Sequence, residues 1–406
     1  MDGRSHAEAS REGIGANVRA ALAGLRILFS TPAYWPASAF GGPVGVLRAL
    51  AGGLVAGGDD VDVLSTSLVD LTHGRSVGTR QVELDGAHVR YLATPFRFRW
   101  MGVTPSLPAV LGGLPRPDIV HVFGFRDPLG TGVAWWCRRR GIPYVLEPLG
   151  MFRPKLRKVP LKRALDATVL APVVRGATLL VATSEVERAE LVGAGVDPGR
   201  IAVRPNGFPV PSTPTRGVLR ARLGLDERTP LVLYVGRIAR GKGIELLVRS
   251  LNEIAGAHLA IVGPDDRHGL LPELVRESRA LGLEDRVHLL GAAPPTELPS
   301  YYADADVFVL ASRHENFGMV AAEAAAAGVP SVVTDRCGIA DLLRDRAGLV
   351  VPYDAGAVRE AIVRLLGDEE LRTRLAAGAH AVAAEWSWPK IVERQRTLYA
   401  DALERA

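Results

Sequence analysis

Cysteine is nearly absent from this chain of 406 residues, which contains only Cys137 and Cys337. Two cysteines so far apart in the sequence form neither a disulfide framework nor a cysteine-rich metal site. The shortage of cysteine therefore excludes a disulfide-stabilised secreted scaffold, and it favours a reducing compartment.

Long apolar runs are also missing. A membrane-spanning helix needs about 18 to 20 apolar residues, and the most apolar helical candidate, 168–182, is interrupted by Pro172 and Arg175. Residues 1–22 are mostly small, polar or charged, so we expect a disordered tail there and no cleavable targeting segment. We expect a soluble, cytoplasmic protein that at most touches the inner face of a membrane.

The excess of basic over acidic residues is small. Lys and Arg number 49 against 44 Asp and Glu, which gives a net charge of +5 and a pI near 9.4. This balance indicates an anionic partner without identifying it. The sequence has no motif of an RNA- or DNA-binding module, so we do not expect nucleic acid as a partner.

Two basic stretches bear on that partner. The densest begins at Arg153 and ends at Arg163; it suits peripheral contact with an anionic membrane or an acidic, lipid-linked acceptor, and a solvated helix face explains it as well. A second stretch, 94–101, alternates aromatic and cationic side chains. It is typical of an acceptor wall or an interfacial anchor.

Short apolar runs alternate with helical stretches along most of the chain, which predicts an α/β fold with parallel sheets covered by helices on both faces. Strands are expected at 26–30, 61–64, 119–122, 144–146, 179–181, 231–235, 259–262, 287–290, 307–310 and 331–333. The alternation lapses in a segment rich in proline and glycine. We therefore expect two doubly wound, Rossmann-like domains whose parallel sheets face each other across a cleft, with chemistry in the loops that follow strands.

The domain boundaries follow from the same pattern. We expect, in chain order, the tail at 1–22, an N-terminal domain at 23–205, a linker at 206–229, a C-terminal domain at 230–385, and a helix at 386–406 that packs back on the N-terminal domain.

The stretch from Ser312 to Glu323 follows an apolar run and leads into an alanine-rich segment, which predicts a strand, a loop and a helix. The N–H groups that open such a helix can face a ligand. Glu315 and Glu323 bracket the helix start, about 12 Å apart by helical rise. That separation suits a clamp on two parts of a long ligand better than a glycosidase pair at about 5–9.5 Å. A helix cap with one surface glutamate explains the two residues equally well.

The second half of the chain opens with a glycine-rich loop, Gly236 to Gly243, directly after an expected strand. It satisfies G-x-x-x-x-G-K, but Gly243 stands where a P-loop needs Ser or Thr for magnesium. We therefore expect no NTPase. Arg237, Lys242 and a helix N-terminus still converge there, which predicts a phosphate cradle. A strand turn with two solvated cations is the simpler alternative.

Weaker signals have plainer explanations. The Gly41-Gly42 pair allows backbone N–H groups close to an anion, and a tight turn explains it about equally well. The two D-x-D patterns, at 60–62 and 304–306, precede or open strands at the end opposite the expected site, so we expect no metal role. His121 lies within an apolar strand, and we expect a hydrogen-bonded core histidine.

Taken together, the Gly236–Gly243 loop and the E-x7-E spacing of Glu315 and Glu323 resemble the retaining, nucleotide-sugar-dependent glycosyltransferases of the GT-B fold, specifically glycosyltransferase family 4 (group 1). The resemblance covers nearly the whole chain. It implies a metal-independent hexosyltransferase that moves a sugar from a UDP- or GDP-sugar such as GDP-mannose to a hydroxyl group of a saccharide, glycolipid or small molecule. It also implies polysaccharide or glycoconjugate biosynthesis, with the nucleoside-diphosphate sugar as co-substrate and no cofactor.

The resemblance assigns roles to individual residues. Arg237 and Lys242 would hold the donor diphosphate and stabilise the charge that grows as it leaves, and Glu315 would contact the sugar ring. Glu323 would accept hydrogen bonds from the ribose. The other donor-binding residues, which act mainly through backbone N–H groups or close approach, would be Gly41, Gly42, Gly236, Gly263, Asn316, Phe317, Gly318, Met319 and Val320.

The sequence departs from the family at one position that matters. Many members carry His or Arg in a Pro-x-Gly motif where this chain has Leu149 followed by Gly150. Glu147 or a neighbouring loop residue would then substitute on the acceptor side. Cys337 also stands where glycine is common, so its loop is expected to differ. Two alternatives stay open: a sugar-nucleotide epimerase on the same architecture, and a catalytically silent sugar-nucleotide-binding subunit.

Overall fold

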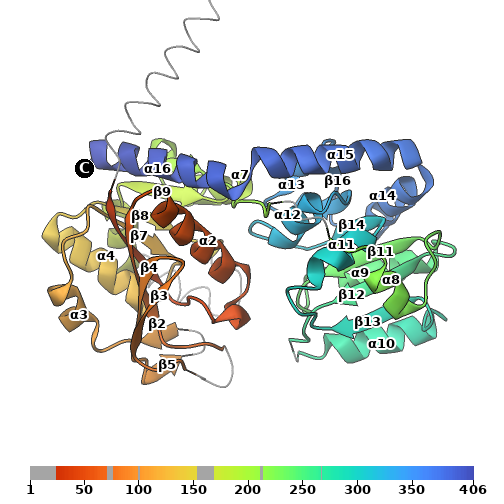
Figure 1. The fold of residues 1–406 in the computed structure, drawn as a ribbon, viewed down its shortest axis with the longest axis horizontal. Helices are drawn as coiled ribbons and strands as arrows, with labels where there is room; N and C mark the ends of the chain where they lie inside the picture. The colour runs from red at the N-terminus through yellow and green to blue at the C-terminus, as the bar shows by residue number, and fades with distance from the viewer. Residues whose placement is uncertain (1–23, 71–75, 99–100, 153–168, 211–213, 267) are drawn as a thin grey trace, which may run out of the picture. The chain divides into compact units, whose positions relative to one another are not determined.

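The structure is a computed structural model that describes residues 24–70, 76–98, 101–152, 169–210, 214–266 and 268–406 (Figure 1). The tail expected at 1–22, the basic run from Arg153 to Arg163, and residues 99 and 100 of the aromatic stretch lie outside the described residues. The chain forms two compact units. One runs to Arg204 and takes in Trp388–Ala406, and the other is Pro205–Ser387.

The first unit is built on an eight-stranded sheet with the order β10-β9-β8-β7-β1-β2-β4-β3. All neighbouring strands are parallel except the last pair, β4 and β3. The strands are β1 (Arg26–Thr31), β2 (Asp60–Thr66), β3 (Arg80–Leu84), β4 (Ala87–Leu92), β7 (Ile119–Phe123), β8 (Tyr144–Glu147), β9 (Leu179–Ala182) and β10 (Ile201–Val203). Because strand order reverses between β1 and β7, the loops after these two strands flank the switch point of the sheet.

Helices cover this sheet, and a small hairpin, β5 (Phe96–Phe98) and β6 (Met101–Val103), lies apart from it. The helices are α2 (Gly42–Ala56), α3 (Leu107–Gly113), α4 (Pro128–Arg140), α6 (Ala171–Gly176), α7 (Glu185–Val192) and α16 (Trp388–Glu404). In Figure 1, α16 lies beside α2 although the two are far apart in the sequence. Gly53 permits this contact, since a Cβ atom there would come within 2.4 Å of Val392.

The second unit contains six parallel strands in the order β13-β12-β11-β14-β15-β16. They are β11 (Leu231–Val235), β12 (His258–Val262), β13 (Val287–Gly291), β14 (Val307–Leu310), β15 (Ser331–Thr334) and β16 (Gly348–Val351). Counted within the unit, the order is 3-2-1-4-5-6, which is that of a doubly wound nucleotide-binding sheet. Its switch point lies between β11 and β14.

Helices surround this second sheet and bury its apolar strands. They are α8 (Val218–Leu223), α9 (Ile244–Asn252), α10 (Leu270–Ala280), α11 (Leu298–Asp304), α12 (Met319–Ala326), α13 (Ala340–Leu343), α14 (Ala355–Gly367) and α15 (Glu369–Glu385). The core of the unit includes Leu233, Phe308 and Val332, which are at most 2% exposed. No helix in the described parts of the chain is both long and apolar enough to cross a bilayer.

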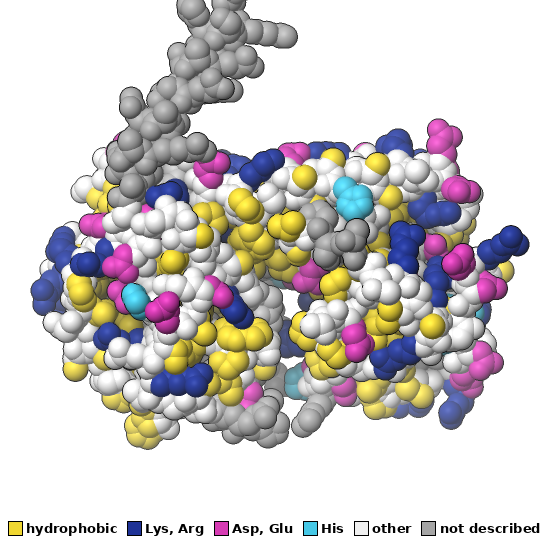
Figure 2. Space-filling view, in the orientation of Figure 1, with side chains coloured by type: hydrophobic (Ala, Val, Ile, Leu, Met, Phe, Trp, Pro, Cys, Tyr) yellow, Lys and Arg dark blue, Asp and Glu magenta, His cyan; other side chains and the backbone are white. Residues whose placement is uncertain are grey.

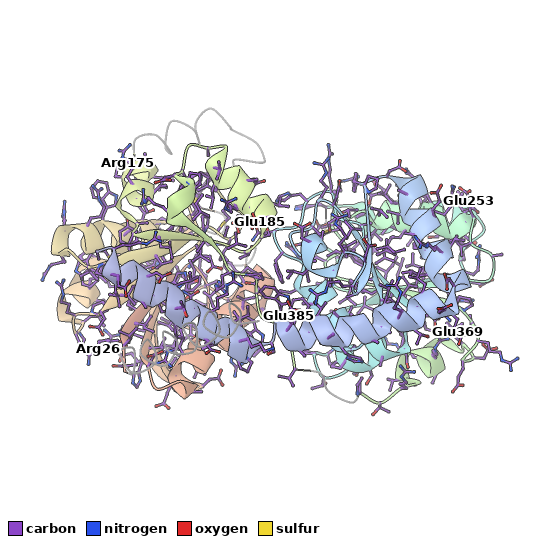
Figure 3. The ribbon with its side chains drawn as sticks, turned by 90° about the horizontal axis from the view of Figure 1, so that it is seen from above. Arg26, Arg175, Glu185, Glu253, Glu369 and Glu385 are labelled. Carbon is purple, nitrogen blue, oxygen red and sulfur yellow. The ribbon has the colours of Figure 1, made fainter. Side chains whose placement is uncertain are left out.

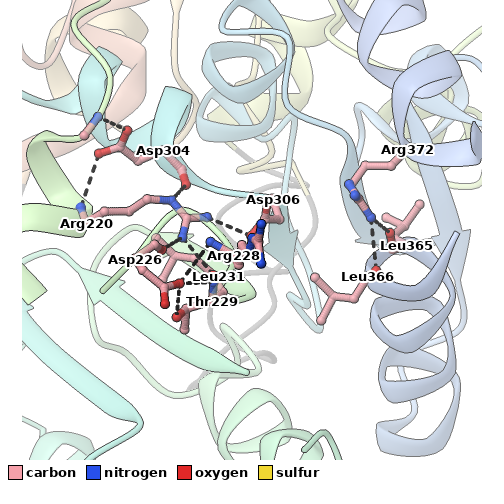
Figure 4. A network of polar contacts seen from close by, with 11 residues as sticks. Arg220, Asp226, Arg228, Thr229, Leu231, Asp304, Asp306, Leu365, Leu366 and Arg372 are labelled. Carbon is pink, nitrogen blue, oxygen red and sulfur yellow. Dashed lines mark hydrogen bonds and ion pairs between the residues drawn. The ribbon is translucent and has the colours of Figure 1, made fainter. Parts of the chain in front are cut away.

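The segment 206–229, expected as a linker, belongs to the second unit and contains α8. Asp304 holds this helix in place because its carboxylate accepts hydrogen bonds from the N–H groups of Leu219 and Arg220, at 2.7 and 3.3 Å (Figure 4). Asp306 accepts from the Leu231 N–H and from the Arg220 guanidinium, at 2.8 and 2.9 Å. The sequence did not reveal these contacts because their partners are more than 70 positions away.

The expected strands and the α/β fold class are confirmed, and the structure adds strands that the sequence analysis missed. β3 was not predicted because its residues are mostly exposed and polar, and β10 was not predicted because it has only three residues. The second D-x-D pattern caps α8 and the start of β11, as just described. Among the described residues, no group of three or more His, Cys, Asp or Glu is placed to hold a metal ion.

Candidate functional site

Two loops meet at the switch point of the second unit. The loop 236–243 follows β11, and the loop 311–318 follows β14; the two strands are parallel neighbours, with Leu233 paired to Phe308. Parallel neighbours end at the same edge of a sheet, so the two motifs that the sequence analysis singled out are brought together. The Arg313 N–H joins them directly by donating to the Gly241 carbonyl at 2.8 Å.

Gly243 sets how closely the loops approach. A Cβ atom at this position would lie 1.9 Å from the Ala311 carbonyl oxygen, and the backbone has φ of +72°. No larger residue fits without moving one of the loops. The glycine that excludes a magnesium-binding hydroxyl from the motif is therefore required by backbone packing against β14.

Lys242 and Glu315 form an ion pair across these loops. The Lys242 Nζ atom lies 2.5 Å from Glu315 Oε2, and the two side chains are 25% and 21% exposed. Arg237 lies in the same loop with an exposed side chain, and its carbonyl accepts a hydrogen bond from the Tyr234 hydroxyl at 3.0 Å. Two of the expected catalytic residues therefore already touch, which the sequence did not predict.

A second loop holds Glu315 and its neighbours in position. The Glu315 N–H donates to the Arg336 carbonyl, and the Gly338 N–H donates to the Glu315 backbone carbonyl, both at 3.0 Å. Cys337 lies between these partners and is fully buried. Its thiol contacts the Thr334 hydroxyl at 3.4 Å. Cysteine therefore takes part in the packing beneath the loop, and burial raises the pKa of its thiol to about 11.

The helix α12 begins next to this loop, with Gly318 as its N-cap. The N–H groups of Ala321 and Ala322 donate to the Gly318 carbonyl. Helix geometry leaves the N–H groups of Met319 and Val320 without an intrahelical acceptor, so they are available to an anion. Phe317 is 3% exposed and packs edge-on against Phe208, so only its backbone can contribute to a site.

Glu323, one turn into α12, has a different environment from Glu315. Tyr302 donates its hydroxyl proton to Glu323 Oε2 at 2.8 Å. Burial raises the pKa of the Glu323 carboxyl, and the Tyr302 hydrogen bond opposes that rise. Both residues line a pocket of about 250 Å³ whose other walls include Pro209, Pro214 and Pro299. Tyr302 was missed in the sequence because it lies on α11, outside any motif.

Gly263 packs against the first loop of the site. Its backbone lies so close to Gly236 that a Cβ atom at Gly263 would come within 1.9 Å of the Gly236 carbonyl oxygen. The Gly236 N–H donates to the Val262 carbonyl at 2.9 Å, which fixes the ends of β11 and β12 together. Gly263 therefore lies directly beside the first loop of the site, a contact that the sequence analysis did not predict.

In the first unit, Gly41 and Gly42 lie where the chain leaves β1 and enters α2. Gly41 is the N-cap and Gly42 the first residue of the helix. Pro43 follows at the second helical position, where its missing N–H costs no helical hydrogen bond. The pair thus stands at the C-terminal edge of the sheet, beside the switch point of this unit.

Glu147 does not fit the expected acceptor role. It is fully buried, with Oε2 hydrogen-bonded to the Arg204 guanidinium at 2.5 Å and 3.3 Å from His121 Nε2. Burial alone would raise the pKa of Glu147, but Arg204 and His121 outweigh burial and lower it. The carboxylate is thus committed to a buried charge cluster, and this part of the expectation is wrong. His121 is the core histidine expected, with Nδ1 2.8 Å from the Tyr399 hydroxyl.

The following residues form a constrained turn. Leu149 has φ of +54°, a conformation that costs non-glycine residues about 1–2 kcal/mol, and it is half-buried. Glu187 braces the turn, since Oε1 accepts from the Gly150 N–H at 2.5 Å and Oε2 from the Thr183 N–H at 2.8 Å. Strained backbone that is held by its surroundings often marks a functional loop.

Glu187 and Arg126 were missed as contributors to this edge. Arg126 also has positive φ, +67°, and its guanidinium donates to the carbonyls of Met151 and Phe152. Glu187 carried a readable signal: Ser184-x-x-Glu187 is the spacing of a helix capping box, and the Ser184 hydroxyl accepts from the Glu187 N–H at 3.2 Å. No comparable sequence pattern pointed to Arg126.

Comparison with known proteins connects this geometry to one family. Residues 216–382 match the model of glycosyl transferases group 1, and residues 41–207 match that of a glycosyl transferase 4-like domain. The D-inositol 3-phosphate glycosyltransferase of Xylanimonas cellulosilytica is 36% identical over 57% of this chain and 59% of its own length. The match to this relative and to three others of the same name covers only 54% to 61% of their lengths.

Two further comparisons extend over more of the chain. D-inositol 3-phosphate glycosyltransferase 1 of Catenulispora acidiphila is 31% identical over 80% of this chain and 83% of its own length. The crystal structure of HepE from Anabaena in complex with UDP superimposes with a TM-score of 0.74 and 20% identity, over 93% of this chain and 100% of the other. That likeness shows that the fold is GT-B. With both domain models matched and a relative aligned over most of its length, the chain belongs to the group 1 glycosyltransferases, family 4.

Proposed function

We propose that this chain transfers a hexose from a nucleoside-diphosphate donor to a hydroxyl group of an acceptor, with retention of the anomeric configuration. Family membership supports the reaction class. The observation that carries the proposal is the Lys242–Glu315 ion pair, which sits at the switch point of a nucleotide-binding sheet beside the start of α12.

The pair suggests how the donor binds. Glu315 offsets the charge of Lys242 and holds its side chain over the loop. Diphosphate oxygens would compete for the ammonium group, together with Arg237, and would release Glu315 to accept hydrogen bonds from the sugar. The cation is thus positioned before the donor arrives, which limits the cost of ordering it.

The same groups can lower the barrier of the reaction. Negative charge grows on the diphosphate as the bond to the sugar breaks, and positioned cations and N–H dipoles stabilise that charge. Lys242 and Arg237 would supply the cations, and Met319 and Val320 the N–H groups. We assign Glu323 to the ribose hydroxyls, the backbone of Asn316 to Gly318 to the sugar, and Gly263 to the neighbourhood of the base.

The donor and acceptor follow from the relatives by analogy. We propose UDP as the nucleotide, since a UDP complex of the same fold is known, with GDP as the other possibility. For the acceptor we propose a small phosphorylated polyol, because the relatives' names specify D-inositol 3-phosphate. A saccharide or lipid-linked acceptor is the alternative.

The test is a matrix of donors and acceptors followed by proton NMR. UDP- and GDP-hexoses are incubated with D-inositol 3-phosphate, with simple sugars, and alone. Transfer should appear with an unchanged anomeric configuration. It should fall by about 100-fold or more in Lys242→Ala and Arg237→Ala, and persist in Arg240→Ala, a charge removal from the same loop.

Each remaining outcome contradicts either the proposed reaction or its assignment to this site. Conversion of the donor without acceptor indicates an epimerase. Tight donor binding without transfer or hydrolysis indicates a silent binding subunit. Wild-type transfer in both Lys242→Ala and Arg237→Ala removes the site assignment while leaving the reaction class intact.

A further inference from the structure

A pocket of about 570 Å³ lies in the first unit, away from the residues discussed so far. Pro143, Thr178 and Arg200 line it, and they immediately precede β8, β9 and β10. These three strands are parallel to β7. The pocket therefore lies at the edge where the strands begin, opposite the edge that carries Leu149 and Gly150.

Four arginines line this pocket: Arg138, Arg175, Arg200 and Arg405. Within the described parts of the chain, none of the four forms an ion pair with a carboxylate side chain. Two arginines of the second unit, by contrast, have carboxylate partners: Arg346 pairs with Glu385 at 2.5 Å and Arg359 with Glu253 at 2.6 Å, and both glutamates are labelled in Figure 3. On the face seen in Figure 2, basic and acidic side chains of that unit are interspersed.

The surrounding backbone positions these side chains. Arg138 lies directly over Gly176, where a Cβ atom would come within 2.6 Å of Arg138 Cδ. Arg200 donates to the carbonyls of Val174 and Arg175 at 3.0 and 3.1 Å. Arg405 donates to the Gly199 carbonyl at 2.9 Å. Backbone carbonyls therefore hold the guanidinium groups of Arg200 and Arg405 in place, and among the described residues neither forms an ion pair with a carboxylate side chain.

Helix dipoles account for only part of this arrangement. Arg138 and Arg175 stand in the last turns of α4 and α6, where a cation is favourable. Arg139 and Arg140 occupy the same last turn of α4 and do not line the pocket. Capping a helix therefore does not require the arginines to converge, and four like charges around one pocket repel one another.

We propose that this pocket binds a ligand that carries phosphate groups. Guanidinium groups recognise phosphate through paired, charge-assisted hydrogen bonds. The volume exceeds the needs of a single phosphate ion and falls within the range of about 300–1,000 Å³ for small-molecule sites. The phosphate could belong to a soluble phosphorylated metabolite or to a phospholipid headgroup. This site is independent of the proposed transfer reaction.

Inorganic pyrophosphate serves as the probe, measured by calorimetry at low ionic strength because salt screens exposed charges. Pyrophosphate would also bind the proposed donor site, so the titration is made in a Lys242→Ala, Arg237→Ala background. Binding should persist there. Adding Arg138→Gln and Arg175→Gln should raise the dissociation constant for pyrophosphate by about tenfold or more, because charge-assisted contacts are lost.

The matched control is Arg139→Gln with Arg140→Gln. It removes the same charge from neighbouring exposed positions, so it should leave binding within about twofold. Equal loss in both double variants would show general electrostatic attraction and would overturn the proposal. Absence of binding in the Lys242→Ala, Arg237→Ala background would overturn it as well.

A second arm distinguishes the two sources of phosphate. Sedimentation with phosphatidylcholine vesicles containing phosphatidic acid is compared with vesicles of phosphatidylcholine alone. Capture by the acidic vesicles that is lost in Arg138→Gln, Arg175→Gln assigns the site to a headgroup. Pyrophosphate binding without capture assigns it to a soluble phosphorylated ligand. Capture that survives in this variant, without pyrophosphate binding, contradicts the proposal.

Discussion

Lys242 and Glu315 are 73 positions apart in the sequence, yet their charged groups lie 2.5 Å from each other. Their contact depends on the pairing of β11 with β14 and on the glycine that lets the following loops touch. The pair therefore joins the two motifs of the site into one unit.

This contact predicts that changes at the two positions are not additive. Lys242→Met should lower turnover by about 100- to 1,000-fold, and Glu315→Gln should lower it as well. The double variant should be less impaired than the sum of the two free-energy losses, because each single change already breaks the pair. Steady-state kinetics of the four proteins measure the coupling. Fully additive losses would show that the two residues act separately.

Gly243 and Gly241 offer a matched pair for stability. Both have positive φ, +72° and +84°, but only at Gly243 would a Cβ atom meet another backbone, the Ala311 carbonyl at 1.9 Å. Gly241→Ala should cost about 1–2 kcal/mol of unfolding free energy from its left-handed backbone. Gly243→Ala should cost roughly 3 kcal/mol or more, since the loops must separate. Urea denaturation measures both values, and equal losses would contradict the close approach.

The sequence could place both motifs of the candidate site in loops that follow strands. Apolar runs marked β11 and β14, and parallel topology puts the loops after both at one edge of the sheet. The ion pair between those loops could not be predicted, because it depends on strand order and on the close approach of Gly243 to Ala311, which only the tertiary structure shows. The same limit applies to Tyr302, whose partner Glu323 is 21 positions away on another helix.

The wrong assignment of Glu147 has a comparable cause. A glutamate at the end of a strand, next to a family motif, suggested a contact with the acceptor. Its actual partners come from β7 and from the residue after β10, which the order β10-β9-β8-β7 gathers around it. Sequence alone shows neither this order nor the burial of Arg204, so the charge cluster could not be predicted.

That buried cluster predicts a loss of stability in acid. Burial is the main cause that lowers the pKa of His121, with Glu147 opposing and Arg204 adding to it. The folded state keeps the ring neutral while the unfolded chain takes up a proton below about pH 6.5. The unfolding free energy should therefore fall as pH drops through that value. The lowered pKa of Glu147 adds a second loss as pH falls below about 4.5.

Denaturant unfolding between pH 7 and pH 5 tests the histidine part. His121→Gln should reduce the slope by up to about 1.4 kcal/mol per pH unit. It should not abolish the slope, because the pKa values of His258 and His288 are also lowered, mainly by burial. His88→Gln, which replaces a histidine at an exposed position of β4, is the comparison variant. An unchanged slope in His121→Gln would contradict the assignment.

Glu323 and Tyr302 predict a pH dependence of donor binding. A carboxylate accepts hydrogen bonds from ribose better than a protonated carboxyl does, and burial raises the pKa of Glu323. The KM for the donor should therefore fall as pH rises through that raised pKa. Tyr302→Phe removes the hydrogen bond that opposes the rise in the pKa of Glu323. The fall in KM should therefore occur at higher pH in this variant. Tyr301→Phe is the matched control, because the neighbouring hydroxyl donates to Glu297 instead, at 2.8 Å. Glu323 does not titrate in contact with the donor if Tyr301→Phe and Tyr302→Phe give the same pH dependence of KM. The same conclusion holds if KM still falls with rising pH in Glu323→Gln.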